Sequence, residues 1–377
     1  MTSGCFEPGF RGGGPVRSVA TILDATSSSV LPTLVTRDRD LGAREPYPGL
    51  SGRWADRGRA RIFYLDLRRP RHWVRLWRDV RPGTFDLLYL NGMWSSISVV
   101  ALLAVRARLV RVPRILIAPR GECSSGALSV KARKKQFFLS VWRHVLRRVD
   151  PEWHATSAGE AADIVTLFPW ARVRLNSGPS TLPAQPIAPP VTTTAGPARL
   201  VFIGRIAAIK NLLLVLTALG RVRAEVVFDI YGPVEDHGYW EQCREALRRL
   251  PSTVRATYRG ELRPEAVRET FHEYDAFLFP TLGENFGHVV AESLSASCPV
   301  ICSAETPWSS VLEAGGGVVL TDPSAEELGG HVERIAAMSP EQRRTARLAA
   351  AAAYRTWRAG ATQPTILDEI LLADAAR

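Results

Sequence analysis

The stretch RLVFIGRIAAIKNLLLVLTALGR, residues 199–221, decides the fold of this chain. Its residues 200–203 are all apolar, without alternating polar side chains, as in a parallel strand that is buried on both faces. Residues 211–221 form a helix candidate, and the turn between strand and helix contains Gly204. A strand that leads through a turn into a helix is the repeating unit of a doubly wound α/β sheet.

The same alternation continues along the second half of the chain. The further predicted strands are residues 226–231, 256–259, 276–280, 300–302 and 318–320, and the predicted helices between them are residues 239–250, 264–273, 286–295 and 325–338. Strand and helix repeats over about 150 residues predict one doubly wound α/β domain.

The first half repeats this pattern, and a proline-rich segment separates the halves. Its predicted strands are residues 31–36, 62–65, 87–90, 115–118 and 153–156. Residues 178–197 hold six prolines and four threonines, which neither a helix nor a central strand tolerates. We therefore predict an N-terminal Rossmann-like domain at 1–180, a linker at 181–198, a C-terminal Rossmann-like domain at 199–355, and a C-terminal helix within 356–377 that packs back on the first domain. Ligands of such sheets bind at the carboxyl ends of the strands.

Length and composition exclude several classes of protein. With 377 residues, 46% of them hydrophobic and 23% charged, the chain is long and apolar enough for two domains with real cores. The best apolar run, residues 97–105, stops at Arg106 and is too short to span a membrane. The first residues lack the pattern of a secretory signal, and the five cysteines form no CxxC pair. These features predict a cytoplasmic protein without a zinc site.

Charge is distributed unevenly along the chain. Residues 51–150 hold 22 Lys and Arg against 6 Asp and Glu, a net charge of +16, whereas residues 201–377 hold 18 against 23, a net charge of −5. We expect the two halves to have different partners.

The strongest local motif is ENFGHVVAE, residues 284–292. It follows the predicted strand at 276–280 and enters a helix, so Glu284 and Glu292 can border one site beside the helix N-terminus. Unpaired N–H groups there favour a phosphate. The ordinary alternative is a helix capped by Glu284 or Asn285, with Glu292 on a solvated face.

A second motif, GRIAAIKN at residues 204–211, places two cations at the end of a strand. Arg205 and Lys210 could hold a diphosphate together, Arg as a planar fork and Lys as a compact charge. Lysine is rare in this chain, which has four lysines beside 44 arginines, so its use at this position favours a specific role. The alternative is a pair of solvated surface cations.

With Tyr231-Gly232-Pro233, YRGEL at 258–262 and Phe279-Pro280-Thr281, these motifs resemble the C-terminal half of a family 4 glycosyltransferase of the GT-B fold. In the first half, GGGPVRS at 12–18, TRDRDLG at 36–42 and APRGE at 118–122 resemble bacterial capsular and exopolysaccharide members. The resemblance implies two doubly wound Rossmann-like domains facing a central cleft, and the transfer of a sugar from a nucleotide-diphosphate donor.

Carried over by position, the resemblance also implies the site residues. The donor-side residues are Gly13 and Gly14 facing the diphosphate, Arg205 and Lys210 on the diphosphate, Glu292 on the ribose, Gly260 and Leu262 beside the base, and Glu284, Asn285, Phe286, Gly287 and His288 around the sugar. Glu284, Arg205 and Lys210 are the catalytic candidates. Arg120 and Glu122, which stand where many relatives carry a histidine, are acceptor-side candidates. Ser297 replaces a usual glycine where a left-handed residue is common.

The mechanism implied by the resemblance retains the anomeric configuration and needs neither metal nor cofactor. Two cations and a helix dipole can stabilise the charge of a departing diphosphate, and this phosphate accepts the proton of the nucleophile. The acceptor would be a hydroxyl of a surface polysaccharide or of its lipid-linked precursor.

Two basic amphipathic segments, residues 68–81 and 128–149, could lie on an anionic membrane surface at the inner face of the plasma membrane. Alternatively, their apolar stripes pack on the sheet and their arginines are only hydrated.

Two rival functions come from other classes. A dinucleotide-dependent oxidoreductase needs GxGxxG after a strand, which Gly12-Gly13-Gly14 does not match. A nucleic-acid-binding protein would explain the basic third but shows no matching motif, so we expect no nucleic acid as partner.

Overall fold

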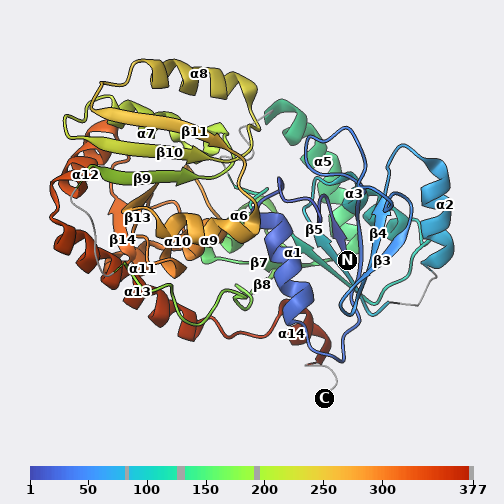
Figure 1. Cartoon of the computed structure of the whole chain (residues 1–377). Coiled ribbons are helices and arrows are strands. Elements are labelled where there is room, and N and C mark those ends of the chain that lie inside the picture. The colour runs from blue at the N-terminus through green and yellow to red at the C-terminus, as the bar shows by residue number, and fades with distance from the viewer. Residues whose placement is uncertain (81–84, 125–131, 191–195, 373–377) are drawn as a thin grey trace. The chain divides into compact units, whose positions relative to one another are not determined.

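The computed structural model describes residues 1–80, 85–124, 132–190 and 196–372, and does not describe the side chains of residues 132–138 and 141. The chain divides into two compact units (Figure 1). The first unit combines Met1–Thr181 with Thr362–Arg377, and the second is Leu182–Ala361.

The second unit contains a six-stranded parallel sheet in the order β11-β10-β9-β12-β13-β14. Its strands are β9 (Ala198–Ile203), β10 (Val226–Tyr231), β11 (Val254–Gly260), β12 (Ala276–Phe279), β13 (Val300–Ser303) and β14 (Gly317–Leu320). Its helices are η1 (Ala208–Lys210), α7 (Leu212–Leu219), α8 (His237–Arg248), α9 (Pro264–His272), α10 (His288–Ser295), α11 (Ser309–Val311), η2 (Leu312–Gly316), α12 (Ala325–Ala337) and α13 (Pro340–Gly360). Helix α7 packs on α8 and α12, and α10 packs on α9 and α13, so two helical groups flank the sheet (Figure 1).

The first unit contains an eight-stranded sheet in the order β3-β4-β2-β1-β5-β6-β7-β8, in which only the β3–β4 pairing is antiparallel among the described strands. Its strands are β1 (Thr2–Ser3), β2 (Thr33–Arg37), β3 (Trp54–Arg57), β4 (Ala60–Leu65), β5 (Leu87–Asn91), β6 (Arg114–Ala118), β7 (Glu152–Ala155) and β8 (Arg172–Leu175). Its helices are α1 (Gly14–Ala25), α2 (Pro70–Asp79), α3 (Ser96–Arg106), α5 (Ala132–Val149), α6 (Ala158–Leu167) and α14 (Ile366–Leu372).

The structure confirms the predicted pair of doubly wound α/β sheets and corrects some element limits. The helix predicted at 286–295 begins at His288, because Gly287 takes a left-handed conformation with φ 76° and caps it. Strands β1, β3 and β8 and the long helix α13 were not predicted. β8 is a partly exposed edge strand with alternating arginines, so its sequence lacks an apolar run. Ser297 has φ 57°, the left-handed conformation expected at that position.

The segment predicted as a linker, 181–198, belongs almost entirely to the second unit. Leu182 and Ile187 pack against the core of that unit, and the Ile187 N–H donates to the Ser295 carbonyl at 2.8 Å. The carbonyl of Pro183 accepts the Tyr354 hydroxyl at 2.6 Å. Proline removes backbone donors but leaves the carbonyls, so a proline-rich segment can still be fastened along a domain surface. Residues 191–195 lie outside the described residues.

The end of the chain returns to the first unit. Helix α13 runs to Gly360, beyond the limit of 355 that the sequence suggested, and α14 follows after a short connection. Ile366, Leu367 and Ile370 of α14 are buried in one cluster with Ile22 and Tyr89 of the first unit. The chain therefore enters the second unit once and leaves it once. In the described part of the chain, no helix is long and apolar enough to span a membrane.

Candidate functional site

In the second unit, the loops after β9, β10 and β11 are joined by backbone hydrogen bonds. The Gly204 N–H donates to the Tyr231 carbonyl at 3.0 Å, and the Gly232 N–H donates to the Gly260 carbonyl at 2.8 Å. A Cβ on Gly232 would lie 1.9 Å from the Gly204 carbonyl oxygen, so only glycine permits this approach. The motif residues at the carboxyl ends of these strands thus form one continuous edge.

The loop after β9 also contacts the loop after β12. The Leu282 N–H and the Thr281 hydroxyl both donate to the Ile209 carbonyl, at 2.8 and 3.0 Å. Lys210 Nζ lies 2.5 Å from Glu284 Oε2, and its side chain is only 11% exposed. The same ammonium lies 5.2 Å from the centre of the Phe279 ring. These contacts bring together two motifs that are 74 residues apart in the sequence.

The segment that leads into α10 is held by hydrogen bonds to the loop that contains Glu305 and Trp308. The Trp308 indole N–H donates to the Phe286 carbonyl, and the Glu284 N–H donates to the Glu305 carbonyl at 3.0 Å. A Cβ on Gly287 would lie 2.9 Å from the Trp308 indole nitrogen, so this position also requires glycine. His288 is the first residue of α10, and its ring lies 4.5 Å from that of Phe286. The segment from Glu284 to Gly287, which leads into α10, is therefore held by the loop that contains Glu305 and Trp308, and Lys210 contacts it through Glu284.

Four further donor-side candidates occupy different positions in the second unit. Glu292 is buried in α10, with 6% of its surface exposed. Gly260 ends β11 with φ 86° and open space where a side chain would be, and Leu262 packs partly against the core. Asn285 is half-buried beside Glu284.

Arg205 and Lys210 do not form an unpaired cationic couple in this structure. Arg205 Nη1 makes an ion pair with Glu235 Oε2, and the Arg205 side chain is 31% exposed. Each of the two cations thus has its own carboxylate partner. The Arg205–Glu235 pair is partly exposed, and such pairs contribute about 0–1 kcal/mol to stability, so an anionic ligand can replace the Glu235 carboxylate at little cost. Glu235 was not among the predicted site residues, although it follows the Tyr231-Gly232-Pro233 motif closely.

In the first unit, Gly13 and Gly14 lie at the N-terminus of α1, as N-cap and first helical residue. The Gly13 N–H donates to the Phe10 carbonyl at 2.9 Å. Among the described residues, no group of three or more His, Cys, Asp or Glu side chains could hold a metal ion.

Arg120 and Glu122 bind the neighbouring loop and strand rather than each other. Arg120 donates from Nη2 to the Tyr89 hydroxyl at 2.8 Å and to Asn91 Oδ1 at 3.1 Å. Glu122 accepts from the backbone N–H groups of Met93 and Trp94, the latter at 3.3 Å. Arg120 therefore connects the loop after β6 to strand β5, and Glu122 connects it to the loop after β5.

A buried histidine continues this network. The His154 Nε2–H donates to the Asn176 carbonyl at 2.7 Å, so Nδ1 accepts from the Tyr89 hydroxyl, also at 2.7 Å. Burial, with a smaller effect of Arg120, lowers the pKa of His154 to about 3. The imidazole is therefore neutral at pH 7 and has a structural role, as expected for a lone histidine.

Glu160 was not predicted, because nothing in its local sequence marks it. It is 3% exposed and accepts from the backbone N–H of Gly121 at 2.8 Å. Its other oxygen accepts from the N–H and the hydroxyl of Thr156 at 2.9 and 2.8 Å. This carboxylate thus joins the Arg120-Gly121-Glu122 loop to the end of β7.

The two basic segments differ in how their apolar faces are covered. In α2, Arg71, Arg75 and Arg78 are exposed, and Val74 between them is 56% exposed. In the described part of α5, Trp142 and other apolar side chains are buried in the unit's own core, while the arginines after residue 142 face solvent. The apolar stripe of α5 is thus used within the protein. Residues 81 and 128–131 of these predicted segments lie outside the described residues.

Comparisons with known proteins give a family match and a set of similar folds. Residues 188–352, somewhat under half of the chain, match the family model described as Glycosyl transferases group 1. No curated protein sequence matches. Solved structures match along nearly the whole chain at low identity, which shows the GT-B fold.

Three of these structures illustrate the match. A sucrose-phosphate synthase from Thermosynechococcus elongatus is 18% identical, with a TM-score of 0.70 over 95% of this chain and 93% of that one. Anabaena HepE, solved with UDP and glucose, is 14% identical, with a TM-score of 0.65 over 100% and 98%. WaaG, described as a glycosyltransferase of lipopolysaccharide biosynthesis, is 15% identical, with a TM-score of 0.64 over 100% and 97%.

Proposed function

We propose that this chain is a retaining, metal-independent glycosyltransferase of the hexosyltransferase type. Its second unit matches the glycosyl transferases group 1 model, and its fold is GT-B. Its donor is a nucleotide-diphosphate sugar. Its acceptor is a hydroxyl group of a surface polysaccharide or of a lipid-linked saccharide.

The observation that carries this proposal is the Lys210–Glu284 pair beside the N-terminus of α10. Lys210 is nearly buried in the family-matched unit, at the carboxyl end of the sheet, where a solvated surface cation would not be found. A compact ammonium and the N–H groups of a helix N-terminus form a site of the kind that binds phosphate oxygens. Arg205, held by a carboxylate that it can release, adds a second cation at the same edge of the sheet.

These groups are suited to the departure of a diphosphate. In the transfer, the bond between the anomeric carbon and the diphosphate oxygen breaks, and the acceptor oxygen bonds to the same carbon on the same face. The acceptor proton passes to the departing phosphate, so the reaction needs no basic side chain. Lys210 and the dipole of α10 stabilise the negative charge that develops on the leaving group.

In this proposal Glu284 and the backbone of residues 286–288 bind the donor sugar, and Glu292 binds the ribose hydroxyls. A carboxylate accepts hydrogen bonds from two neighbouring hydroxyls, which suits either role. Gly260 and Leu262 border the base. The roles of Gly13, Gly14, Asn285, Arg120 and Glu122 remain predictions from the resemblance.

Calorimetric titration with a panel of nucleoside diphosphates and their sugars tests the donor site. We expect binding of at least one of them, and we expect Lys210→Ala, Arg205→Ala and Glu292→Ala each to weaken it strongly while the thermal transition persists. Arg244→Ala is the matched control, because Arg244 also pairs with a glutamate but lies on the exposed α8. Equal affinity in all four variants would refute the site. The anomeric configuration of the product, read by NMR, tests retention.

We further infer that the enzyme works in the cytoplasm at the inner face of the plasma membrane, through α2. Support comes from its exposed arginines and from Val74, and a lipid-linked acceptor would make such a location useful. Each basic residue near an anionic surface contributes about 1 kcal/mol.

Flotation with anionic and neutral vesicles tests this location. The triple variant Arg71→Gln, Arg75→Gln and Arg78→Gln should bind anionic vesicles roughly 100-fold more weakly. The control is Arg244→Gln, Arg248→Gln and Arg249→Gln on or beside α8, with the same change of charge. Equal binding of both triple variants would contradict a role for α2.

A further inference from the structure

Four aromatic side chains of the second unit form one cluster beside the segment that leads into α10. Phe286 lies in that segment, Trp308 follows β13, and Tyr354 and Trp357 lie on α13. The Trp308 ring centre lies 6.1 Å from that of Phe286 and 4.6 Å from that of Trp357. The Trp357 ring centre lies 5.8 Å from that of Tyr354. These contacts join three stretches of chain that are far apart in the sequence.

The end of this aromatic cluster on α13 is fastened to the backbone of the same unit. The Tyr354 hydroxyl donates to the Pro183 carbonyl at 2.6 Å, and Arg358 Nε donates to the Leu182 carbonyl at 2.9 Å. Trp357 follows Tyr354 on the next turn of the helix and therefore lies on the same face of α13. Helix α13 thus holds Trp357 in a fixed place against Trp308.

At the other end of the cluster, Trp308 fixes the orientation of one peptide group. Trp308 is 2% exposed, and its indole N–H donates to the Phe286 carbonyl. The peptide bond between Phe286 and Gly287 is trans, so its N–H points opposite to its carbonyl. Because the carbonyl is directed at Trp308, the Gly287 N–H points away from the aromatic cluster.

The Gly287 N–H has no acceptor within the described part of the chain. Gly287 is buried, and none of the described residues accepts a hydrogen bond from its N–H. A buried N–H without a partner costs free energy, which an oxygen atom of a ligand can restore. The Glu284 side chain lies against the same glycine, since its Cγ is 3.1 Å from the place of a Cβ. A donor and a carboxylate side by side suit a hydroxyl group, which both accepts and donates.

We propose that Trp308 is a positioning residue of the donor site, which directs the Gly287 N–H at a hydroxyl oxygen of the donor sugar, and that Trp357 supports it. The proposal rests on the proposed function. It assigns the affinity for the sugar part of the donor to this cluster, and the affinity for the diphosphate to Lys210 and Arg205.

A positioning role differs from core packing in its geometry and in its consequences. A residue that only fills volume needs no hydrogen bond to a loop carbonyl. A Cβ on residue 287 would lie 2.9 Å from the Trp308 indole nitrogen, so the indole reaches the backbone only because this residue is glycine. Loss of core packing would weaken the binding of every ligand of the unit, whereas a turned peptide group would weaken the binding of the sugar alone.

The first test compares the affinities for a nucleotide sugar and for its parent diphosphate. The probes are UDP-glucose, GDP-mannose and ADP-glucose, each titrated beside UDP, GDP or ADP, and the pair that binds is used. Trp308→Phe keeps an aromatic ring but removes the N–H, so we expect about tenfold weaker binding of the nucleotide sugar. The affinity for the parent diphosphate should not change.

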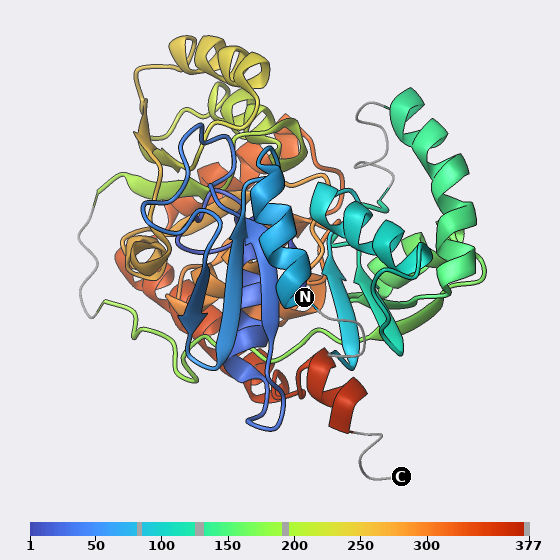
Figure 2. The ribbon, with the colours of Figure 1, turned by 90° about the vertical axis from the view of Figure 1, so that its right-hand side faces the viewer.

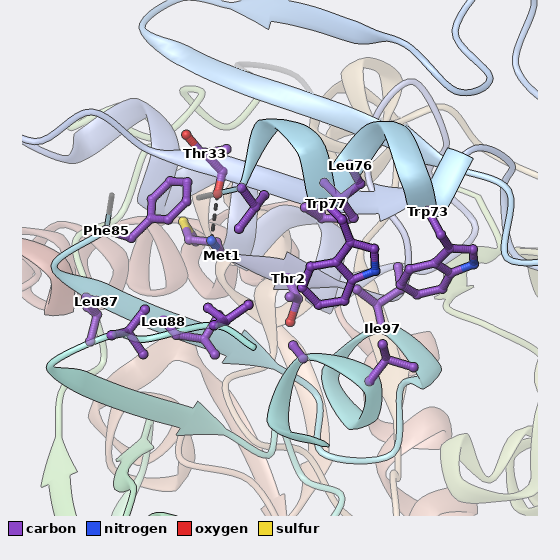
Figure 3. Close-up of a pocket in the computed structure, with 16 residues that line it drawn as sticks. Met1, Thr2, Thr33, Trp73, Leu76, Trp77, Phe85, Leu87, Leu88 and Ile97 are labelled. Carbon is purple, nitrogen blue, oxygen red and sulfur yellow. Dashed lines mark hydrogen bonds between the residues drawn. The ribbon is translucent and has the colours of Figure 1, made fainter. Parts of the chain in front are cut away.

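The matched control is Trp73→Phe in the first unit. Helices α2 and α3 cover one face of the sheet of this unit (Figure 2, blue and cyan). Trp73 of α2 lines an apolar pocket between these helices and the sheet (Figure 3). Its indole N–H donates to the Leu67 carbonyl at 3.1 Å, so the control loses the same kind of hydrogen bond. Both affinities should stay unchanged in this variant.

A second measurement uses the unsubstituted protein and does not depend on the folding of a variant. Saturation with the nucleotide sugar should slow hydrogen exchange of the Gly287 amide at least about tenfold relative to saturation with the parent diphosphate. Trp357→Phe keeps the Trp308 hydrogen bond and weakens only its support. It should reduce the preference for the nucleotide sugar over the diphosphate about threefold.

The outcomes separate this proposal from the proposed function. If none of the pairs binds, the proposed function is wrong and this proposal falls with it. If a pair binds, three results would overturn this proposal alone: an equal loss of both affinities in Trp308→Phe, no loss of either, or equal exchange of the Gly287 amide with the two ligands. Should Trp308→Phe fail to fold, the exchange of the Gly287 amide decides.

Discussion

The carboxyl ends of the two parallel sheets use charged side chains in different ways. In the second unit, Lys210 and Arg205 each bind a carboxylate side chain. In the first unit, Glu160 and Glu122 accept from backbone N–H groups. The Arg205–Glu235 pair is partly exposed and can be exchanged for a ligand, whereas removal of the buried Glu160 carboxylate leaves its backbone N–H partners without an acceptor. Charged side chains in the second unit are therefore available to bind a ligand, whereas those in the first unit fix the positions of loops.

The largest expected effect tests the holding role. Glu160→Ala removes the acceptor of the Gly121 and Thr156 N–H groups and should cost about 3 kcal/mol of unfolding free energy. Urea denaturation measures it. Glu241→Ala, which breaks the exposed pair with Arg244 on α8, is the control and should cost less than about 0.5 kcal/mol. Equal losses of unfolding free energy in the two variants would mean that the buried Glu160 stabilises the protein no more than an exposed ion pair does.

The next effect tests the ligand role. Lys210→Met keeps an unbranched apolar side chain but removes the ammonium that lies over Phe279, and should weaken binding of a nucleoside diphosphate by about 50-fold, or roughly 2.3 kcal/mol. Calorimetry at low salt measures it, with Arg244→Met as the control. If Lys210→Met unfolded the protein and left the affinity of the remaining folded fraction unchanged, Lys210 would belong with the holding groups.

A pH dependence of stability should arise in the first unit. The pKa of His154 falls from its ordinary value near 6.5 to about 3 in the folded protein, so below pH 6.5 the unfolded chain binds a proton that the native imidazole does not. This contribution is complete above pH 6.5 and is lost as pH falls toward 3, by about 1 kcal/mol per pH unit. His154→Gln should flatten the dependence between pH 6.5 and 5, measured by urea titration at several pH values. The control is His144→Gln, at an exposed histidine. If it reduced the pH dependence of the unfolding free energy as much as His154→Gln does, the dependence could not be assigned to His154.

The smallest effect concerns the pair between Arg205 and Glu235. Glu235→Gln should change the unfolding free energy by less than about 0.5 kcal/mol, because both side chains are partly exposed. By releasing the guanidinium it should raise the affinity for a nucleoside diphosphate about two- to threefold at low salt, an effect that vanishes at high salt. Weaker binding would mean that Glu235 orients Arg205 for the ligand.

Much of the fold follows from local sequence, and the exceptions have physical causes. The apolar runs that became β9, β10 and β12 are unambiguous because strands buried on both faces need no polar alternation. β8 was not predicted, because an edge strand can be half solvated and carry arginines, and it then lacks the apolar run of a buried strand. The helix predicted at 286–295 was placed two residues early, since Gly287 is a left-handed N-cap and the carbonyl of Phe286 before it accepts from the distant Trp308 indole N–H.

The candidate site was predictable only as a set of segments. The motifs at the ends of strands indicated which loops would meet, because the carboxyl ends of parallel strands lie at one edge of a sheet. The side-chain partners were not predictable: Arg205 and Lys210 were predicted to bind a diphosphate together, and the sequence did not indicate that each cation binds its own carboxylate in this structure. Partner choice depends on side-chain directions and distances of a few ångströms, which spacing along the chain does not encode.

The sequence alone determined the α/β class, the two sheets, the uneven charge and the loops that carry the chemistry, because these depend on periodicity and composition within short windows. Only the tertiary structure decided that Lys210 contacts Glu284 and that Glu160 holds the Gly121 loop. Each of these joins residues far apart in the chain. Their free energy comes from burial and hydrogen-bond geometry, which exist only once the folded backbone has brought the partners together.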